Sequence, residues 1–306
     1  MLSIIAKRLA QSVFILLGVT MITFSLSFMM PADPVRMIAG RSATKATVES
    51  IRKELGLDKP LPVQYVKYVT RLVQLDLGRS YKQKTQVTEL IKSRLPATLL
   101  LMAGAIFFEI LIGIPAGILA ATQRGKTWDN WIMAVSFAGV SMPQFVLGLL
   151  LLYVFAYLFG FFPLGGYGTW KHLFLPALTL GISGGGWYSR MVRSSMVDVL
   201  SQDYIRTARA KGLSEFKTIM VHGLRNGILP IIAMIGLDVG IFMAGAVVVE
   251  SVFGWPGIGQ MAWQAIQMVD IPVIMGVTLV AAIGIIIGNL LADLIMPFVD
   301  PKMRVE

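Results

Sequence analysis

The chain has 306 residues, of which 56% are hydrophobic and only 14% are charged, and its formal net charge is +10. Soluble domains carry about 25% Asp, Glu, Lys and Arg, so a fully water-facing surface is excluded and we expect an all-α integral membrane protein. The absence of cysteine excludes disulfides and thiol chemistry. The positive charge does not indicate nucleic-acid binding, because no basic stretch contains the interleaved aromatic residues of a stacking surface.

Residues 1–30 contain the first apolar run, which follows Lys7 and Arg8. This run is longer than the apolar part of a signal peptide and has no small-residue cleavage site at its end. It therefore predicts a cytoplasmic N-terminal end and a retained transmembrane helix. Residues 31–97 then bring many charges and turn signals, which predict a small helical insert outside the bilayer.

A transmembrane core is predicted over residues 98–296, with a cytoplasmic tail at 297–306. A helix needs about 20 mostly apolar residues to cross the bilayer. The fourth apolar run is short and interrupted by Gly184-Gly185-Gly186, which we interpret as a site of close helix packing and not as a phosphate-binding loop. With the first run, the core gives about six spans, the later five covering residues 98–121, 131–162, 173–189, 228–249 and 271–296.

The distribution of Lys and Arg predicts the orientation. If the N-terminus is cytoplasmic, 13 of the 27 basic residues fall in cytoplasmic segments, and only Lys171 falls in a short external loop. The insert holds the remaining 13, but long loops cross the membrane largely regardless of their charge. We therefore expect both termini in the cytoplasm.

The longest cytoplasmic segment of this topology, residues 190–227, is patterned. Its apolar and small residues recur at spacings of 3 and 4, which predicts one face of a helix. An apolar face outside the membrane can lie on the lipid surface or dock in a groove of a partner protein, and the spacing alone does not choose between them. The residues of this face are Ile205, Ala208, Gly212, Phe216 and Ile219.

Residues 203–213 read Asp-Tyr-Ile-Arg-Thr-Ala-Arg-Ala-Lys-Gly-Leu and are followed by His-Gly-Leu-Arg-Asn at 222–226. This order resembles the cytoplasmic signature of binding-protein-dependent ABC importer permeases. Further stretches resemble the dipeptide, oligopeptide, glutathione and nickel permease subfamily, so the resemblance covers essentially the whole chain. These stretches are residues 31–34, 55–61, 75–78, 141–143 and 250–259.

The sequence departs from the family pattern at three places. Arg206-Thr207-Ala208 stands where the general importer signature has Glu-Ala-Ala, a change that the subfamily tolerates. Ala32 replaces a glycine after the first span, and Val269 precedes Asp270 where the subfamily often has arginine. The last two departures lie outside the cytoplasmic signature.

The resemblance implies that the cytoplasmic segment forms a coupling helix inserted into a cleft of an ATPase. Small residues such as Ala208 and Ala210 let two backbones approach closely, and Gly212 also allows a turn between two short helices. The residues that the resemblance assigns to coupling are Tyr204, Ile205, Thr207, Ala208, Arg209, Ala210, Lys211, Gly212, Leu213 and Phe216.

The resemblance also implies the partners and the substrate. The partners are a second homologous permease subunit, two cytoplasmic ATPase subunits and an extracytoplasmic binding protein, all at a bacterial inner membrane. ATP and Mg would bind to the ATPases, so no cofactor is expected in this chain. Di- and oligopeptides are the expected substrates, with glutathione or nickel chelates as the alternative.

No catalytic or metal site is expected. The two histidines, His172 and His222, fall on opposite sides of the membrane in this topology, and signatures of serine nucleophiles, zinc proteases and phosphate-binding loops are missing. An intramembrane enzyme, which needs its catalytic groups at one depth, is therefore disfavoured. A secondary carrier is generally longer and built from internal repeats, which this sequence lacks.

Four acidic residues lie within or beside the apolar runs. Ionisable residues inside the membrane are costly and indicate function by default. Asp293 lies near the inner helix end, where a pair with Lys302 or Arg304 would satisfy it, and Glu250 lies near the outer rim. Glu109 and Asp238 lie deeper, and they either line a translocation path or hydrogen-bond between helices.

Overall fold

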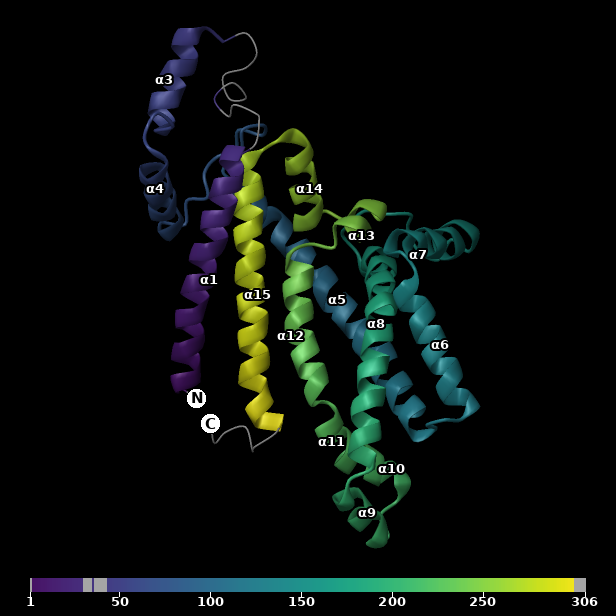
Figure 1. Ribbon diagram of the computed structural model, residues 1–306. Helices are drawn as coiled ribbons and strands as arrows, with labels where there is room; N and C mark the ends of the chain where they lie inside the picture. Colours follow the sequence, from purple (N-terminus) through teal and green to yellow (C-terminus); the bar gives the residue numbers. More distant parts are fainter. Residues whose placement is uncertain (1, 30–34, 36–42, 300–306) are drawn as a thin grey trace.

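The computed structural model describes residues 2–29, 35 and 43–299 (Figure 1). Apart from an isolated bridge between Arg79 and Gln86, the regular structure of these residues is helical. The stretch at residues 31–34 and the tail at 300–306, with Lys302 and Arg304, lie outside the described residues. The expectation of an all-α chain is confirmed.

The first and last helices, α1 (Leu2–Met29) and α15 (Ile271–Val299), lie side by side and antiparallel (Figure 1). Arg8 Nε and Asp293 Oδ2 form an ion pair of 2.8 Å between them. Asp293 is therefore paired with a residue at the other end of the sequence. The start of α1 and the end of α15 lie at the same end of the molecule.

Two amphipathic helices, α3 (Lys45–Leu55) and α4 (Leu61–Val73), lie at the opposite end (Figure 1). The Thr44 hydroxyl caps α3 by accepting a hydrogen bond from the Thr47 backbone N–H. On α4, Tyr65 and Tyr68 pack against Phe24 of α1 with ring centroids 5.3 and 5.9 Å apart. Burial raises the pKa of Tyr68 to about 12.

The longest helices, α5 (Val87–Thr122) and α8 (Trp170–Leu200), pack along each other at the centre of the molecule. Glycines make this approach close: a Cβ added to Gly117 would lie only 2.5 Å from the Cβ of Val192. The α8 helix also runs without a break through Gly184-Gly185-Gly186, where we expected an interruption. Close packing compensates for the low helix propensity of glycine in these positions.

The predicted third span, residues 131–162, is sharply bent. The α6 helix (Thr127–Ser141) and the following α7 (Gln144–Leu151) with η1 (Leu152–Leu158) meet at an angle of 102°. Pro143 causes this bend, because it has no N–H to donate and forces Met142 out of the helical region, to ψ 127°. The α7 helix therefore lies crosswise beside the upper end of α8 (Figure 1).

The chain after α8 continues as α9 (Asp203–Ala210), α10 (Glu215–Lys217), η2 (Thr218–Gly223), α11 (Leu224–Gly227), α12 (Leu229–Met243), α13 (Val247–Val252) and α14 (Ile258–Met268). The predicted fifth span ends earlier than expected, because α12 stops at Met243 and Gly245 turns the chain with a φ of +99°. The α12 helix packs along α15, where Gly240 meets Ile285.

Three helices of the described chain are long and apolar enough to cross a membrane, and the number rises to five if each bent pair is one span. The three are α1, α5 and α15, and the pairs are α6 with α7 and η1, and α10 through α12. The remaining predicted span lies in α8, whose second half carries charged residues such as Arg190 and Arg193. Six spans therefore stay a prediction.

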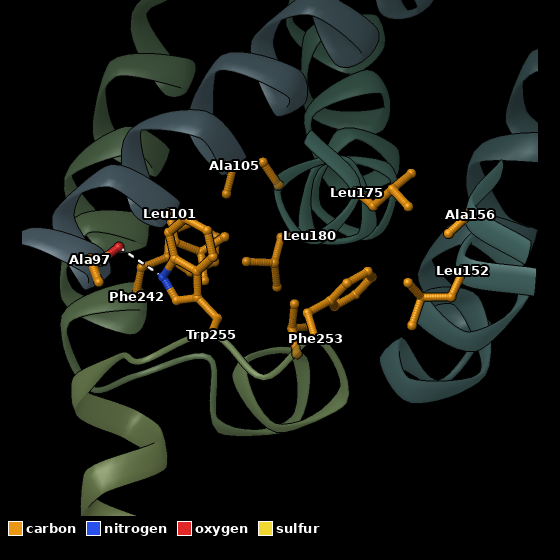
Figure 2. Close-up of a cluster of buried hydrophobic side chains, with 12 residues drawn as sticks. Ala97, Leu101, Ala105, Leu152, Ala156, Leu175, Leu180, Phe242, Phe253 and Trp255 are labelled. Atoms are coloured by element: carbon orange, nitrogen blue, oxygen red, sulfur yellow. Dashed lines mark hydrogen bonds between the residues drawn. The ribbon is translucent and has the colours of Figure 1, made fainter. Parts of the chain in front are cut away.

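A buried apolar cluster holds the loop between α13 and α14, residues 253–257, against α5 and α8 (Figure 2). Trp255 is fully buried at its centre, and its indole Nε1–H donates a 2.9 Å hydrogen bond to the Ala97 carbonyl. Phe253 reaches from the same loop toward α8 and η1. The loop after α13 is thus anchored by side chains that have no polar group left unpaired.

Candidate functional site

The segment that the resemblance assigns to coupling, α9 and α10 (residues 203–217), lies at the end farthest from α3 (Figure 1). It continues directly from α8 through Ser201 and Gln202. Gly212 follows α9 with a φ of +76°, a conformation that other residues adopt only with strain. The turn expected at Gly212 is therefore present.

The predicted five-residue apolar face does not exist as one surface. Ile205 is 0% exposed and Ala208 is 7% exposed, whereas Phe216 is 75% exposed. The turn at Gly212 redirects the chain, so residues beyond it lose the register of α9. Because α9 packs against η2, Ile205 and Ala208 are covered by the chain itself, and neither lipid nor a partner groove receives them.

The exposed side of the α9–α10 segment is fixed by polar contacts. Arg209 forms a hydrogen-bonded ion pair with Glu215 across the Gly212 turn. The Nε–Oε1 and Nη2–Oε2 distances are 2.8 and 3.3 Å. Asn226 Nδ2 donates to the Tyr204 hydroxyl at 2.8 Å. The assigned coupling residues that are exposed are Tyr204, Thr207, Arg209, Ala210, Lys211, Gly212 and Phe216, while Leu213 is half-buried.

The two deep acidic residues meet inside the helix packing. Glu109 of α5, which is 2% exposed, lies beside Asp238 of α12. The Tyr188 hydroxyl of α8 donates a hydrogen bond to Asp238 Oδ2. The Glu109 carboxyl group also fills the space next to Gly184 that a side chain would need. The burial of Glu109 favours hydrogen bonding between helices for that residue, whereas Asp238 is only half-buried.

Tyr188 was missed by the sequence reasoning. It stands four residues after Gly184 on α8, so both face α5 and α12 from the same side of the helix. A hydroxyl-bearing side chain in an apolar run is a weak signal, because tyrosine is also common near membrane interfaces.

A second buried acid lies on α13 (Val247–Val252). Glu250 of α13 is 0% exposed, and its Oε2 accepts a 2.6 Å hydrogen bond from the Gln260 backbone N–H in the first turn of α14. Burial raises the pKa of Glu250 to about 7, although the Gln260 hydrogen bond and the charge of Arg94 oppose the shift. The carboxylate caps α14, since anions are favoured at helix N-termini.

Asp270 lies directly before α15. It connects the start of α15 to the loop that precedes α5. Its carboxylate accepts hydrogen bonds from Ser80 Oγ at 2.5 Å and from the backbone N–H groups of Tyr81 and Lys82 at 3.0 and 3.3 Å. Burial, together with the charge of Asp270, raises the pKa of Tyr81 to about 12. Val269, one of the departures from the family pattern, has a φ of +57° at this junction.

Within the part of the chain that the structure describes, no group of three or more His, Asp or Glu side chains could hold a metal ion. His172 Nδ1 lies 2.7 Å from the Thr169 hydroxyl, and His222 lies on η2 at the other end of α8. The two histidines are therefore separated by the length of that helix.

Comparison with known families decides the assignment. The family described as "Binding-protein-dependent transport system inner membrane component" matches residues 113–305, and the N-terminal domain family of the same transport systems matches residues 1–102. The chain belongs to this family. The two matches meet within α5, so the boundary between them falls inside one continuous helix.

Curated relatives agree with this assignment. The glutathione transport system permease proteins GsiC of Escherichia coli K12 and of Salmonella typhimurium LT2 are each 40% identical to this chain over 304 residues, 99% of both chains. A chain of the inward-facing methionine ABC transporter MetNI superposes with a TM-score of 0.56 at 18% identity, over 69% of this chain and 96% of that one. This likeness concerns the fold alone.

The chain is thus a multi-pass inner-membrane permease subunit of an ABC importer, and the resemblance found in its sequence is confirmed. Its relatives are permease subunits of ABC transporters, in which the ATPase is a separate subunit and a binding protein delivers the substrate.

Proposed function

We propose that this permease subunit imports short peptides delivered by a binding protein, with di- and oligopeptides and glutathione, itself a tripeptide, as the substrate class. The identity of 40% to glutathione permeases over nearly the whole chain supports a substrate of this class. Nickel chelates are the alternative within the subfamily.

The proposed assembly contains a second homologous permease subunit, two cytoplasmic ATPase subunits that bind ATP and Mg, and an extracytoplasmic binding protein. Both termini of this chain lie in the cytoplasm. The common end of α1 and α15 supports that placement, because it is also the end that carries the α9–α10 segment (Figure 1).

The observation that carries the coupling role is the exposed α9–α10 segment at the end of one long helix. The α8 helix has 31 residues, so it is about 46 Å long at 1.5 Å per residue. Closure of the ATPases around bound ATP pulls this segment, and α8 carries the displacement toward the outer side. The energy is released in the ATPases, and this chain transmits motion.

The exposed residues of the segment supply the proposed docking surface. Phe216 and Tyr204 present aromatic side chains to the ATPase, and Lys211 and Arg206 add positive charge at the rim. Aromatic anchors surrounded by polar residues are typical of binding hot spots. Ile205 and Ala208 would contribute indirectly, because their burial holds α9 against η2.

The test is reconstitution of the full complex in proteoliposomes. ATP hydrolysis and uptake would be measured with the binding protein loaded in turn with a dipeptide, a pentapeptide, glutathione or a nickel chelate. We expect a peptide or glutathione to stimulate hydrolysis and to accumulate inside. Stimulation by the nickel chelate alone would refute the substrate class, and hydrolysis without uptake of any of them would refute the import function.

A further inference from the structure

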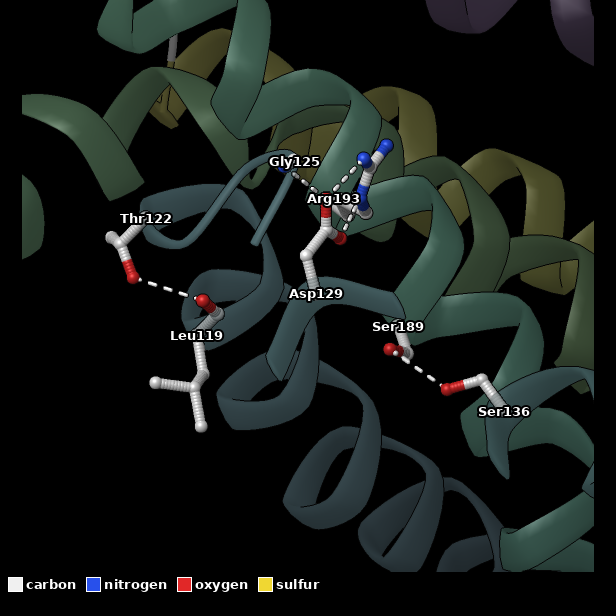
Figure 3. A network of polar contacts seen from close by, with 7 residues as sticks. All are labelled: Leu119, Thr122, Gly125, Asp129, Ser136, Ser189 and Arg193. Carbon is white, nitrogen blue, oxygen red and sulfur yellow. Dashed lines mark hydrogen bonds and ion pairs between the residues drawn. The ribbon is translucent and has the colours of Figure 1, made fainter. Parts of the chain in front are cut away.

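An ion pair between a buried carboxylate and a partly exposed guanidinium joins α6 to α8 (Figure 3). Asp129, in the first turn of α6, is 1% exposed. Arg193 of α8 binds this carboxylate in a bidentate manner. The distances are 2.5 Å from Nε to Oδ1 and 2.7 Å from Nη2 to Oδ2. The Gly125 backbone N–H donates to the same carboxylate at 2.8 Å.

The pair is the first contact of a longer seam between α6 and α8. Two turns along α6, Ser136 Oγ lies 3.2 Å from Ser189 Oγ (Figure 3). The Ser136 backbone oxygen also fills the space that a side chain at Gly186 would need. The bidentate charged pair adds to these contacts an interaction that has one favourable geometry.

The position of the pair connects the α9–α10 segment to α6. Arg193 stands two turns before the end of α8, and only Ser201 and Gln202 separate that end from α9. Any displacement of the segment that moves the end of α8 therefore acts on Asp129. Separation of the two helices would leave a buried carboxylate without its partner, which is strongly unfavourable.

From α6 the contacts continue to the outer side. Beyond the bend at Pro143, α7 packs against α13. A Cβ added to Gly148 of α7 would lie 3.1 Å from the ring of Phe253 and 3.4 Å from Val252. A continuous series of packed elements thus runs from the α9–α10 segment to α13, which holds Glu250.

We propose that the Asp129–Arg193 pair is a positioning pair for transport: it makes α6 follow α8, so that a pull on the cytoplasmic segment moves α7 against α13. This inference rests on the proposed coupling function. The rival role is purely structural, in which the pair only keeps α6 in place during folding.

The discriminating variant is Arg193→Lys, which keeps the positive charge but cannot form the bidentate pair of hydrogen bonds. Asp129→Asn, which keeps the shape and loses the charge, is the second variant. The control is Arg8→Lys, since Arg8 makes an ion pair of similar length with Asp293 that joins α1 to α15 and touches neither α6 nor α8. All would be reconstituted as the full complex with its ATPases, second permease and binding protein.

The measurements are substrate imported per ATP hydrolysed and the thermal midpoint of each complex. For Arg193→Lys and Asp129→Asn we expect import per ATP to fall about tenfold, the effect of losing a charge-assisted hydrogen bond, with stimulated hydrolysis within about twofold of native. Arg8→Lys should leave the ratio unchanged.

Two results would overturn the inference while the native complex still imports. One is an unchanged ratio in both variants. The other is a parallel loss of uptake, hydrolysis and thermal midpoint, which is the signature of a structural role. A native complex that imports none of the tested substrates would overturn the proposed function instead, and the inference with it.

Discussion

The turn at Gly212 offers the sharpest test of the coupling role. Its φ is +76°, and a Cβ placed there would meet no atom within 4 Å. Replacing Gly212 with valine therefore causes no overlap and acts through the backbone, where a left-handed conformation costs an L-residue about 1–2 kcal/mol. A β-branched side chain lies at the upper end of that range.

The magnitude of the effect follows from what holds the turn. The Arg209–Glu215 pair that bridges it is exposed on both sides and contributes at most about 1 kcal/mol. It does not offset a strain of about 1–2 kcal/mol, so the population of the native turn falls about 5–30-fold. The core is untouched, and the protein should reach the membrane in normal amounts.

The assay is uptake of a labelled peptide in proteoliposomes, normalised to the inserted protein. We expect Gly212→Val to reduce uptake by about 5–30-fold, in line with the lost population of the turn. Gly160→Val is the matched control, because Gly160 has a φ of +65° and equally open surroundings but lies after η1, away from the segment. Normal uptake by Gly212→Val, or an equal loss in both variants, would refute the reasoning.

Three further predictions concern the buried polar groups. Tyr188→Phe removes the donor to Asp238 and should cost about 1–3 kcal/mol, measured as a lower thermal midpoint in detergent. Gly184→Ala forces a methyl group against the Glu109 carboxyl and should cost about 1–3 kcal/mol; Gly18→Ala, with open surroundings, is its control. Glu250, with its pKa raised to about 7, binds its proton more tightly in the folded than in the unfolded state. The free energy of unfolding should therefore fall by up to about 3 kcal/mol as the pH rises from 4.5 to 7. Glu250→Gln should flatten this pH dependence.

Apolar composition predicted where most membrane helices lie, but not how they bend. The runs of α1, α5 and α15 are long and apolar, and helices follow from them directly. Residues 131–162 are equally apolar on both sides of Pro143, so the hydropathy of the run concealed a bend of 102°. Gly184–Gly186 suggested an interruption, because glycine is a poor helix former in isolation; only the packing against α5 and α6 makes it compatible with a continuous α8.

The helical pattern read from the sequence also extended too far in the α9–α10 segment. The spacing from Ile205 to Ile219 suggested one helical face, although Gly212 at positive φ ends that face after Ala208. Pairs made over long sequence distances leave no local signal. Arg193 and Asp129 are 64 residues apart, and Tyr188 and Asp238 are 50 apart, so only the fold brings them together.

The glycine contacts between α5 and α8 have a consequence for how this permease can change its substrate. At Gly113, Gly117 and Gly181 even one methyl group would overlap the neighbouring helix, so almost every substitution in this interface is deleterious. Substitutions are tolerated more readily at exposed positions, such as Trp131 and Val135 on α6 and Leu149 on α7. Selection for a new cargo in the laboratory should accumulate its substitutions there, and leave the α5–α8 interface unchanged.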